Sequence, residues 1–153
     1  MLVDGLVKTA EGIVSTIDQS LFTDGNVVTC NTVPSIDSTG RFLNVRFTWP
    51  NVNNNNRDHP DFLITVKGKQ LICETEQYDT LVYVATDLQY EPTFFTNYKE
   101  CNFQTVTVAG DVVSCVYACA CAPEYCEAVH IYILGSGSSA PNRELCEVEF
   151  TQN

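Results

Sequence analysis

Apolar and polar residues alternate along several stretches of this chain, with the period of two that is typical of β-strands with one buried face. The alternation is regular over residues 41–49, and it recurs in the closing stretch Leu145-Cys146-Glu147-Val148-Glu149-Phe150. It does not decide which faces of the closing strand hold Val148 and Phe150. The other strand-like runs are residues 62–66, 80–86, 103–108, 112–121 and 128–134.

Turn-forming residues separate these runs. Gly68, Gly110-Asp111 and residues 135–141 interrupt the pattern, and Pro50 with the polar residues 51–60 has the composition of a loop. In the first twenty residues, glycines and β-branched residues favour extended segments, so we expect a lead-in strand and a loop there. Helical periodicity is nearly absent. Many short strands joined by turns predict an antiparallel β-sandwich or barrel.

Length and composition set the size and class of the protein. The chain has 153 residues, 44% of them apolar, which is enough for a soluble domain with its own core. We therefore expect residues 1–153 to form a single domain. The 19 acidic and 8 basic residues give a net charge of −11, which disfavours nucleic acid and anionic lipids, because phosphate contacts need Lys and Arg. Cations and neutral ligands remain compatible with this charge.

The chain has eight cysteines, and most of them lie in or beside strand-like runs. An even number of such cysteines predicts disulfides formed in an oxidising compartment, so we expect an extracellular, secreted protein. Residues 1–5 lack the basic start and the apolar run of a secretory signal, and no stretch has the apolar length of a membrane helix. We therefore interpret the sequence as a mature or excised module.

Four of the cysteines lie close together in the sequence, and these are Cys115, Cys119, Cys121 and Cys126. The first three share parity and would lie on one face of a strand. This spacing suits bridges to the segments that carry Cys73 and Cys101. A zinc site would need ligand pairs that converge at a tight turn, and a redox site would need a C-x-x-C motif; this spacing offers neither.

The closing strand also indicates a long-range bridge and a metal ion. A bridge from Cys146 to the first cysteine, Cys30, would close a loop over most of the chain and stabilise the fold by roughly 3–5 kcal/mol in the entropic model. It would also bring Glu147 beside Asp24 and Asn26. Acidic side chains that converge on a turn rich in carbonyl oxygens repel each other unless a hard cation such as Ca²⁺ lies between them. The sequence therefore predicts a structural calcium ion.

Three segments together resemble a known family. They are Leu21-Phe22-Thr23-Asp24-Gly25-Asn26 followed by Thr29-Cys30, the strand from Phe42 to Phe47, and the closing Leu145-Cys146-Glu147-Val148-Glu149-Phe150. Their order and spacing resemble the discoidin, or coagulation-factor C-type, domains, and most closely the fucose-binding F-type lectin branch. The likeness runs from about residue 6 to residue 150. It implies a jelly-roll β-sandwich of the galactose-binding-domain-like kind, in agreement with the strand pattern.

The resemblance also implies a set of calcium ligands. In the F-type branch the ion is held by side-chain and backbone oxygens, and every corresponding position in this chain is chemically suitable. The corresponding groups are the Leu21 carbonyl, Asp24, Asn26, Thr29, the Cys146 carbonyl and the Glu147 carboxylate. The alternative is that Asp24 caps a turn and that Glu147 is a solvated strand residue.

The sugar site of the F-type lectins is matched only in part. It uses a histidine shortly after the first cysteine and two arginines that flank a pair of adjacent cysteines. Here Thr32 falls at the histidine position, Arg57-Asp58 resembles the start of the arginine motif, and the adjacent cysteines and the second arginine are missing. We therefore do not expect fucose specificity. Arg57 and His59 either form a different polar site in the 51–61 loop or are solvated loop residues.

The resemblance further implies how the remaining cysteines pair. The family often bridges the segment after its mid-chain strands to the strand before residues 125–129. The implied pairs are Cys101 with Cys119 or Cys121, and Cys73 with Cys115 or Cys126. We expect no free cysteine in the chain.

The motifs of common enzymes are missing from the sequence. No Ser-His-Asp order, phosphate-binding glycine loop or carboxylate pair indicates catalysis, and we expect His130, inside the apolar run 129–134, to be a packed or cross-strand residue. We expect a calcium-stabilised binding or adhesion module that recognises a glycan or a protein on cell surfaces or in the extracellular matrix. The alternative is a structural building block, repeated in a larger protein, a fibre or an oligomer. The net charge of −11 disfavours attachment to membrane lipids.

Overall fold

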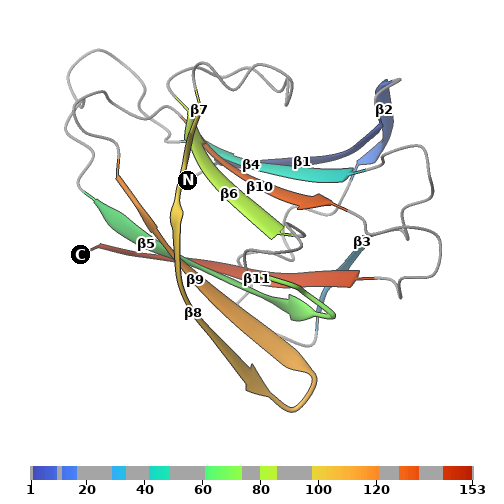
Figure 1. The fold of residues 1–153 in the computed structure, drawn as a ribbon. Coiled ribbons are helices and arrows are strands. Elements are labelled where there is room, and N and C mark those ends of the chain that lie inside the picture. Colours follow the sequence, from blue (N-terminus) through green and yellow to red (C-terminus); the bar gives the residue numbers. More distant parts are fainter. Residues whose placement is uncertain are drawn as a thin grey trace.

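The computed structural model describes residues 2–9, 12–16, 29–33, 42–48, 61–73, 80–85, 98–120, 128–134 and 143–152. Within these ranges the chain forms eleven β-strands and no helix (Figure 1). The strands are β1 (Leu2–Thr9), β2 (Gly12–Thr16), β3 (Asn31–Val33), β4 (Phe42–Thr48), β5 (Phe62–Lys69), β6 (Thr80–Ala85), β7 (Tyr98–Glu100), β8 (Asn102–Ala109), β9 (Val112–Cys119), β10 (Ala128–Leu134) and β11 (Arg143–Gln152). The described residues include no helix that is long and apolar enough to cross a membrane.

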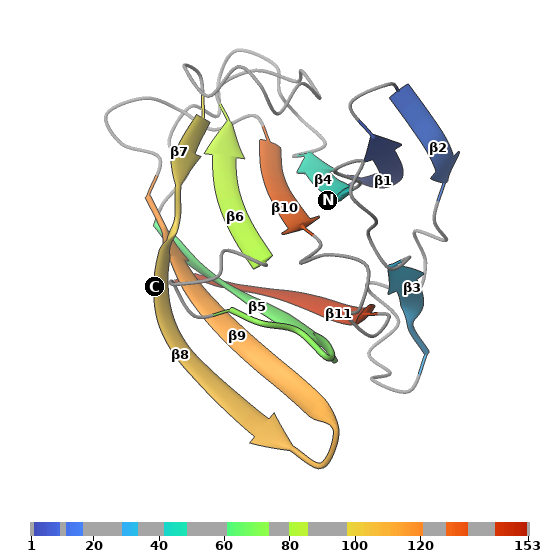
Figure 2. The same ribbon diagram turned by 45° about the vertical axis from the view of Figure 1, so that its right-hand side comes forward.

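The strands form two antiparallel sheets that lie face to face (Figures 1 and 2). Sheet A has six strands in the order β2-β1-β4-β10-β6-β7, and sheet B has five strands in the order β3-β11-β5-β9-β8. The last strand, β11, lies between β3 and β5, so the closing stretch of the sequence is central to sheet B. Such non-consecutive neighbours are typical of jelly rolls. The predicted antiparallel jelly-roll β-sandwich is confirmed.

The core lies between the two sheets and is formed by alternate residues. In β5 every second side chain is buried, beginning with Phe62, and β9 follows the same pattern up to Cys119. Sheet A contributes Val82, Val84, Val129 and Ile131, each at most 3% exposed. Complete burial of one aliphatic side chain stabilises a fold by roughly 1.5–3 kcal/mol, so these alternating faces hold the sheets together.

Tyr117 joins the two sheets through both parts of its side chain. Its residue is 3% exposed, and its hydroxyl donates a hydrogen bond of 3.1 Å to the carbonyl oxygen of Thr80 in β6. Its ring meets the ring of Phe103 edge-on at 5.9 Å. A buried tyrosine needs such a partner for its hydroxyl, and here the partner belongs to the opposite sheet.

Three short strands were not predicted from the sequence. β3 and β7 have three residues each, too few for an alternation to be recognised. β2 lies where we expected only a loop, and it pairs with β1, with Lys8 opposite Ile13. β5 continues beyond the expected run to Lys69, because its pairing with β9 and β11 persists past Gly68.

The chain reverses sharply after β5. Gln70 has a φ of 61°, and the following Leu71 and Cys73 are 6% and 7% exposed, so the segment returns into the core. Gly68 makes this return possible. A Cβ atom at Gly68 would collide with the carbonyl oxygen of Glu144 and would lie 2.8 Å from Cδ1 of Leu71. The turn signal read at Gly68 therefore reflects a close approach of two backbones inside a strand.

Three disulfides lie within the described residues. They join Cys30 to Cys146, Cys73 to Cys115, and Cys101 to Cys119. Each is a pair that the sequence or the resemblance had suggested. Cys101 lies where the chain passes from β7 in sheet A to β8 in sheet B, and its N–H donates to the Val82 carbonyl at 2.8 Å. Cys121 and Cys126 lie outside the described residues.

Candidate functional site

The candidate site is centred on an irregularity in β11. Leu145 pairs with Gly68, but Glu147 pairs with Lys67, so Cys146 is an extra residue in β11 and forms a β-bulge. Strict alternation, which the sequence suggested for this strand, is broken here. The side chains of residues 145–148 are all buried, whereas Glu149 is exposed.

The bulge determines where the Glu147 side chain lies. Without it, Glu147 would pair with Val66, which is 0% exposed between the sheets. With it, Glu147 pairs with Lys67, on the outer face of sheet B, while Leu145 and Val148 both contribute to the core. The bulge therefore keeps a carboxylate out of the apolar core. Val148 and Phe150, whose faces the alternation left open, both pack on the core side.

Glu147 is nevertheless only 5% exposed. A buried carboxylate is tolerated when charged or polar groups compensate for its lost hydration. We had considered a solvated Glu147 as the alternative to a ligand role, and its burial argues against that alternative. The burial of Glu147 is the strongest observation at this site.

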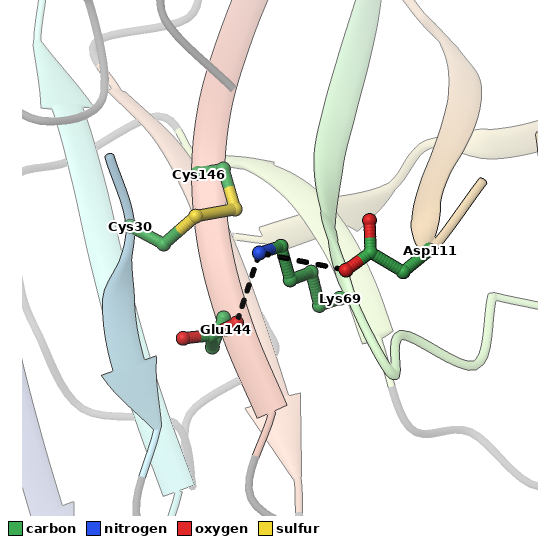
Figure 3. Close-up of polar contacts among 5 residues, drawn as sticks. All are labelled: Cys30, Lys69, Asp111, Glu144 and Cys146. Carbon is green, nitrogen blue, oxygen red and sulfur yellow. Dashed lines mark ion pairs between the residues drawn. A yellow bond between two sulfur atoms is a disulfide. The ribbon is translucent and has the colours of Figure 1, made fainter. Parts of the chain in front are cut away.

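The disulfide at Cys146 brings a second segment to the same place. β3 pairs with β11, with Leu145 opposite Asn31, and one more step of this register places Cys30 opposite Cys146. The two cysteines form a disulfide there (Figure 3). Thr29 and Cys30 are half-buried.

Exposed ion pairs surround the site on β5 and β11. The Lys67 amino group lies 2.9 Å from Oε1 of Glu149. Figure 3 shows the Lys69 amino group, which lies 3.5 Å from Oδ2 of Asp111 and 3.8 Å from Oε2 of Glu144. Each pair stabilises the fold by about 0–1 kcal/mol, because solvent screens the charges. These pairs show that both lysines are already held by acidic residues other than Glu147.

The predicted calcium ligands are described only in part. Thr29, Cys146 and Glu147 are among the described residues, and Cys146 and Glu147 are both buried in β11, while Thr29 precedes the Cys30 that is bridged to Cys146. Carbonyl and carboxylate oxygens are the ligand types that a hard cation prefers. Leu21, Asp24 and Asn26 lie outside the described residues. The described residues alone contain no cluster of three or more His, Cys, Asp or Glu side chains that could hold a metal.

Of the four predicted sugar-site residues, only Thr32 lies among the described residues. Thr32 lies in β3, where its backbone is in register with Glu144 of β11. Arg57, Asp58 and His59 lie outside the described residues.

A row of polar residues across sheet A was not predicted. His130 in β10 is in register with Arg46 in β4 and Tyr83 in β6, and the row continues to Asp4 in β1 and Glu100 in β7. His130 is 0% exposed, as expected for a packed cross-strand residue, Tyr83 is half-buried and Glu100 is exposed. Sequence reasoning missed this row because it depends on the register of five strands.

Comparisons with known proteins show similarity at the level of the fold. No family model matches the sequence, and no curated protein matches it. The structure is similar to a solved chain of the Streptococcus pneumoniae beta-galactosidase BgaA, with a TM-score of 0.53 and 10% sequence identity. The match covers 99% of this chain and 91% of the other chain. It supports the β-sandwich fold described above.

Proposed function

We propose that this chain is an extracellular, calcium-stabilised binding module that recognises a glycan or a protein and has no catalytic role. The observation that carries the proposal is the position of Glu147. Glu147 is 5% exposed, directly after the bulge of β11 and the bridge between Cys30 and Cys146. The F-type lectins, which this sequence resembles, place a calcium ligand at the corresponding position.

Two broader observations support the same function. Three disulfides in the described residues agree with an oxidising, extracellular environment. The fold is shared with a chain of a beta-galactosidase, a protein that acts on a carbohydrate, so glycans are the first class of ligands to test. On folds of this kind, binding residues are commonly carried by the loops between strands.

Calcium would be held by the carboxylates of Glu147 and Asp24 together with oxygens of Leu21, Asn26, Thr29 and Cys146. When bound, the ion would supply positive charge that compensates for the buried carboxylate of Glu147. The bulge and the disulfide have a separate role, which is to position the ligand residues. The bulge directs Glu147 to the outer face of sheet B, and the disulfide fixes Cys30 to Cys146, the residue before Glu147. This division predicts that the fold can form without calcium but is less stable.

The first prediction tests the calcium site with a matched pair of variants in one strand. A chelator should lower the melting temperature of the wild type, because calcium binds only the folded state. Glu147→Gln should remove this response. Glu149→Gln should preserve it, since Glu149 is exposed and pairs with Lys67 instead. Differential scanning calorimetry with calcium or chelator at constant ionic strength makes the comparison.

The outcomes of this experiment are distinct. A wild type whose melting is unaffected by the chelator, and which shows no heat of calcium binding, would contradict the calcium site. An equal loss of response in both variants would indicate only a general charge effect. Because the chain carries a net charge of −11, constant ionic strength is needed to separate specific binding from screening.

The binding role needs a separate measurement. A glycan array probed with the wild type, with calcium and then with chelator, should show binding to a restricted set of glycans that weakens on chelation. Binding that is unchanged in chelator would separate recognition from calcium. If no glycan binds, a protein ligand becomes the remaining form of the proposal.

A further inference from the structure

The edges of the two sheets differ in how well they are protected. An edge strand presents unpaired N–H and C=O groups, and proteins protect such strands by keeping them short, charged, bulged or covered. Among the described strands, the edges are β2 and β7 in sheet A, and β3 and β8 in sheet B. β2, β3 and β7 have five, three and three residues, but β8 has eight. β8 is therefore the long edge strand of the described structure.

The composition of β8 does not protect it. Residues 102–109 include no charged residue and no proline, although the chain has 19 acidic and 8 basic residues. The short edge strand β7, by contrast, carries Lys99 and Glu100, and both are exposed. β8 instead carries alternating threonine and valine residues, which favour β-pairing. No described strand pairs with its outer edge.

A bulge in β8 limits the regularly paired part of this strand to residues 105–109. The register with β9 shifts between Phe103 and Thr105, and from there to Ala109 the pairing is regular. Figure 2 shows β8 at the outer edge of sheet B, with the β8–β9 hairpin extending away from sheet A. Val108, on this hairpin, is 66% exposed. Residues 105–109 therefore combine a regular edge, with no described strand paired along it, and an exposed apolar side chain.

We propose that residues 105–109 of β8 pair antiparallel with the same residues of a second copy of this chain, about a two-fold axis at Thr107. In this arrangement Thr107 lies opposite Thr107 of the other copy, and Val108 lies opposite Val106. Each exposed Val108 then gains an apolar cross-strand neighbour, and β-branched pairs of this kind stabilise antiparallel sheets. The two five-stranded sheets become one continuous sheet.

A second copy fits this edge better than a charged partner does. Identical strands in antiparallel pairing are self-complementary. Each contact between two different positions, such as Val106 with Val108, occurs twice, once on each side of the two-fold axis. The net charge of −11 makes two copies repel each other over most contacts, but residues 102–110 carry no formal charge. The edge therefore offers two copies a neutral place of contact. This inference does not depend on calcium or on a glycan.

The second prediction tests this pairing by charge substitution at the proposed axis. In sedimentation velocity over a wide range of protein concentration, the wild type should be a dimer. Thr107→Lys and Thr107→Glu should each be monomeric, because two like charges would face each other directly. An equimolar mixture of the two variants should regain the dimer, and native mass spectrometry should identify it as the mixed species.

A matched control is available in the interior strand β11. Thr151 is also an exposed threonine, and Thr151→Lys should leave the dimer unchanged. Circular dichroism and melting curves establish that all the variants fold. A monomeric wild type, a dimer that survives Thr107→Lys, or a mixture that remains monomeric would each overturn the proposal. If the wild type is monomeric, a strand of a different protein becomes the alternative partner for the β8 edge.

Discussion

Gly68 lies at a point where the backbone of β11 and the returning side chain of Leu71 both approach β5. The third prediction is that Gly68→Ala lowers the free energy of unfolding by about 1–3 kcal/mol, the usual range for overpacking. The Cβ atom would collide with the carbonyl oxygen of Glu144, a backbone atom that cannot rotate away, and would lie 2.8 Å from Leu71. Urea denaturation with an unchanged slope measures the effect.

Gly110 provides the control for this prediction. It lies in the turn between β8 and β9 with a φ of 64°, and a Cβ atom there would have no neighbour within 4 Å. Asparagine adopts positive φ more readily than most residues, so Gly110→Asn should change stability by less than about 1 kcal/mol. If Gly68→Ala were as harmless as Gly110→Asn, the close approach of β11 would not be a constraint on the fold.

Glu147 shows what could be predicted at the scale of a residue. Its type and its position after Cys146 led to a ligand hypothesis, and its burial of 95% agrees with a role for its carboxylate, since only 5% of the residue is exposed. The bulge that orients it was not predictable. In a regular strand, Leu145 and Glu147 would lie on one face and Cys146 and Val148 on the other. Alternation alone therefore does not decide which of these two pairs faces the core.

The fourth prediction concerns how the disulfides connect elements. The bridge between Cys30 and Cys146 joins residues 116 apart, whereas the bridge between Cys101 and Cys119 joins residues 18 apart. In the entropic model, replacing the long-range pair by alanine should destabilise the fold by about 1–1.5 kcal/mol more than replacing the short-range pair. This difference remains after allowing for the Cys73–Cys115 bridge, which shortens the larger loop.

Thermal and urea unfolding of the two double variants gives the difference directly. Peptide mapping without reduction should recover Cys30 and Cys146 in one linked fragment. Separate fragments for these two cysteines would contradict the pairing itself, and an equal loss of stability in both double variants would contradict the entropic ordering.

Elements were predictable from the sequence where one face is buried along the whole strand. β5 and β9 alternate buried and half-buried residues over most of their length, and their patterns were readable. β3 and β7 are formed by pairing with β11 and β6 rather than by their own composition, so nothing local distinguishes them. β8 was readable as a strand, but its place at the edge follows from the strand order alone.

At the scale of the whole molecule, charge and fold together limit the partners. The chain has a net charge of −11. On the outer face of sheet B, Lys67 and Lys69 form ion pairs with acidic side chains. These two lysines therefore do not form a free basic patch for phosphate groups. Cations, uncharged ligands such as neutral glycans, and neutral edges such as residues 105–109 are all compatible with the net charge of −11.

The fifth prediction is that free L-fucose does not bind at about millimolar concentration. The F-type sugar site offers a histidine and two arginines to the sugar, and each charge-assisted hydrogen bond contributes roughly 1.5–3 kcal/mol. The resemblance places Thr32 at the histidine position and Arg57 at that of one arginine, with no counterpart for the second arginine. Thr32 also lies in register with Glu144, an acidic residue that cannot replace a donor.

The loss of two such donors should weaken binding by several kcal/mol, and every 1.4 kcal/mol is about a factor of ten in affinity. Saturation-transfer NMR with L-fucose should therefore show no transfer to the sugar, with Arg57→Ala indistinguishable from the wild type. A transfer signal that Arg57→Ala abolishes would contradict this prediction, because it would show that the retained arginine still serves a fucose site. With no such signal, recognition must use other groups, and Arg57 and His59 in the 51–61 loop are the first candidates, to be tested against the glycans that the array identifies.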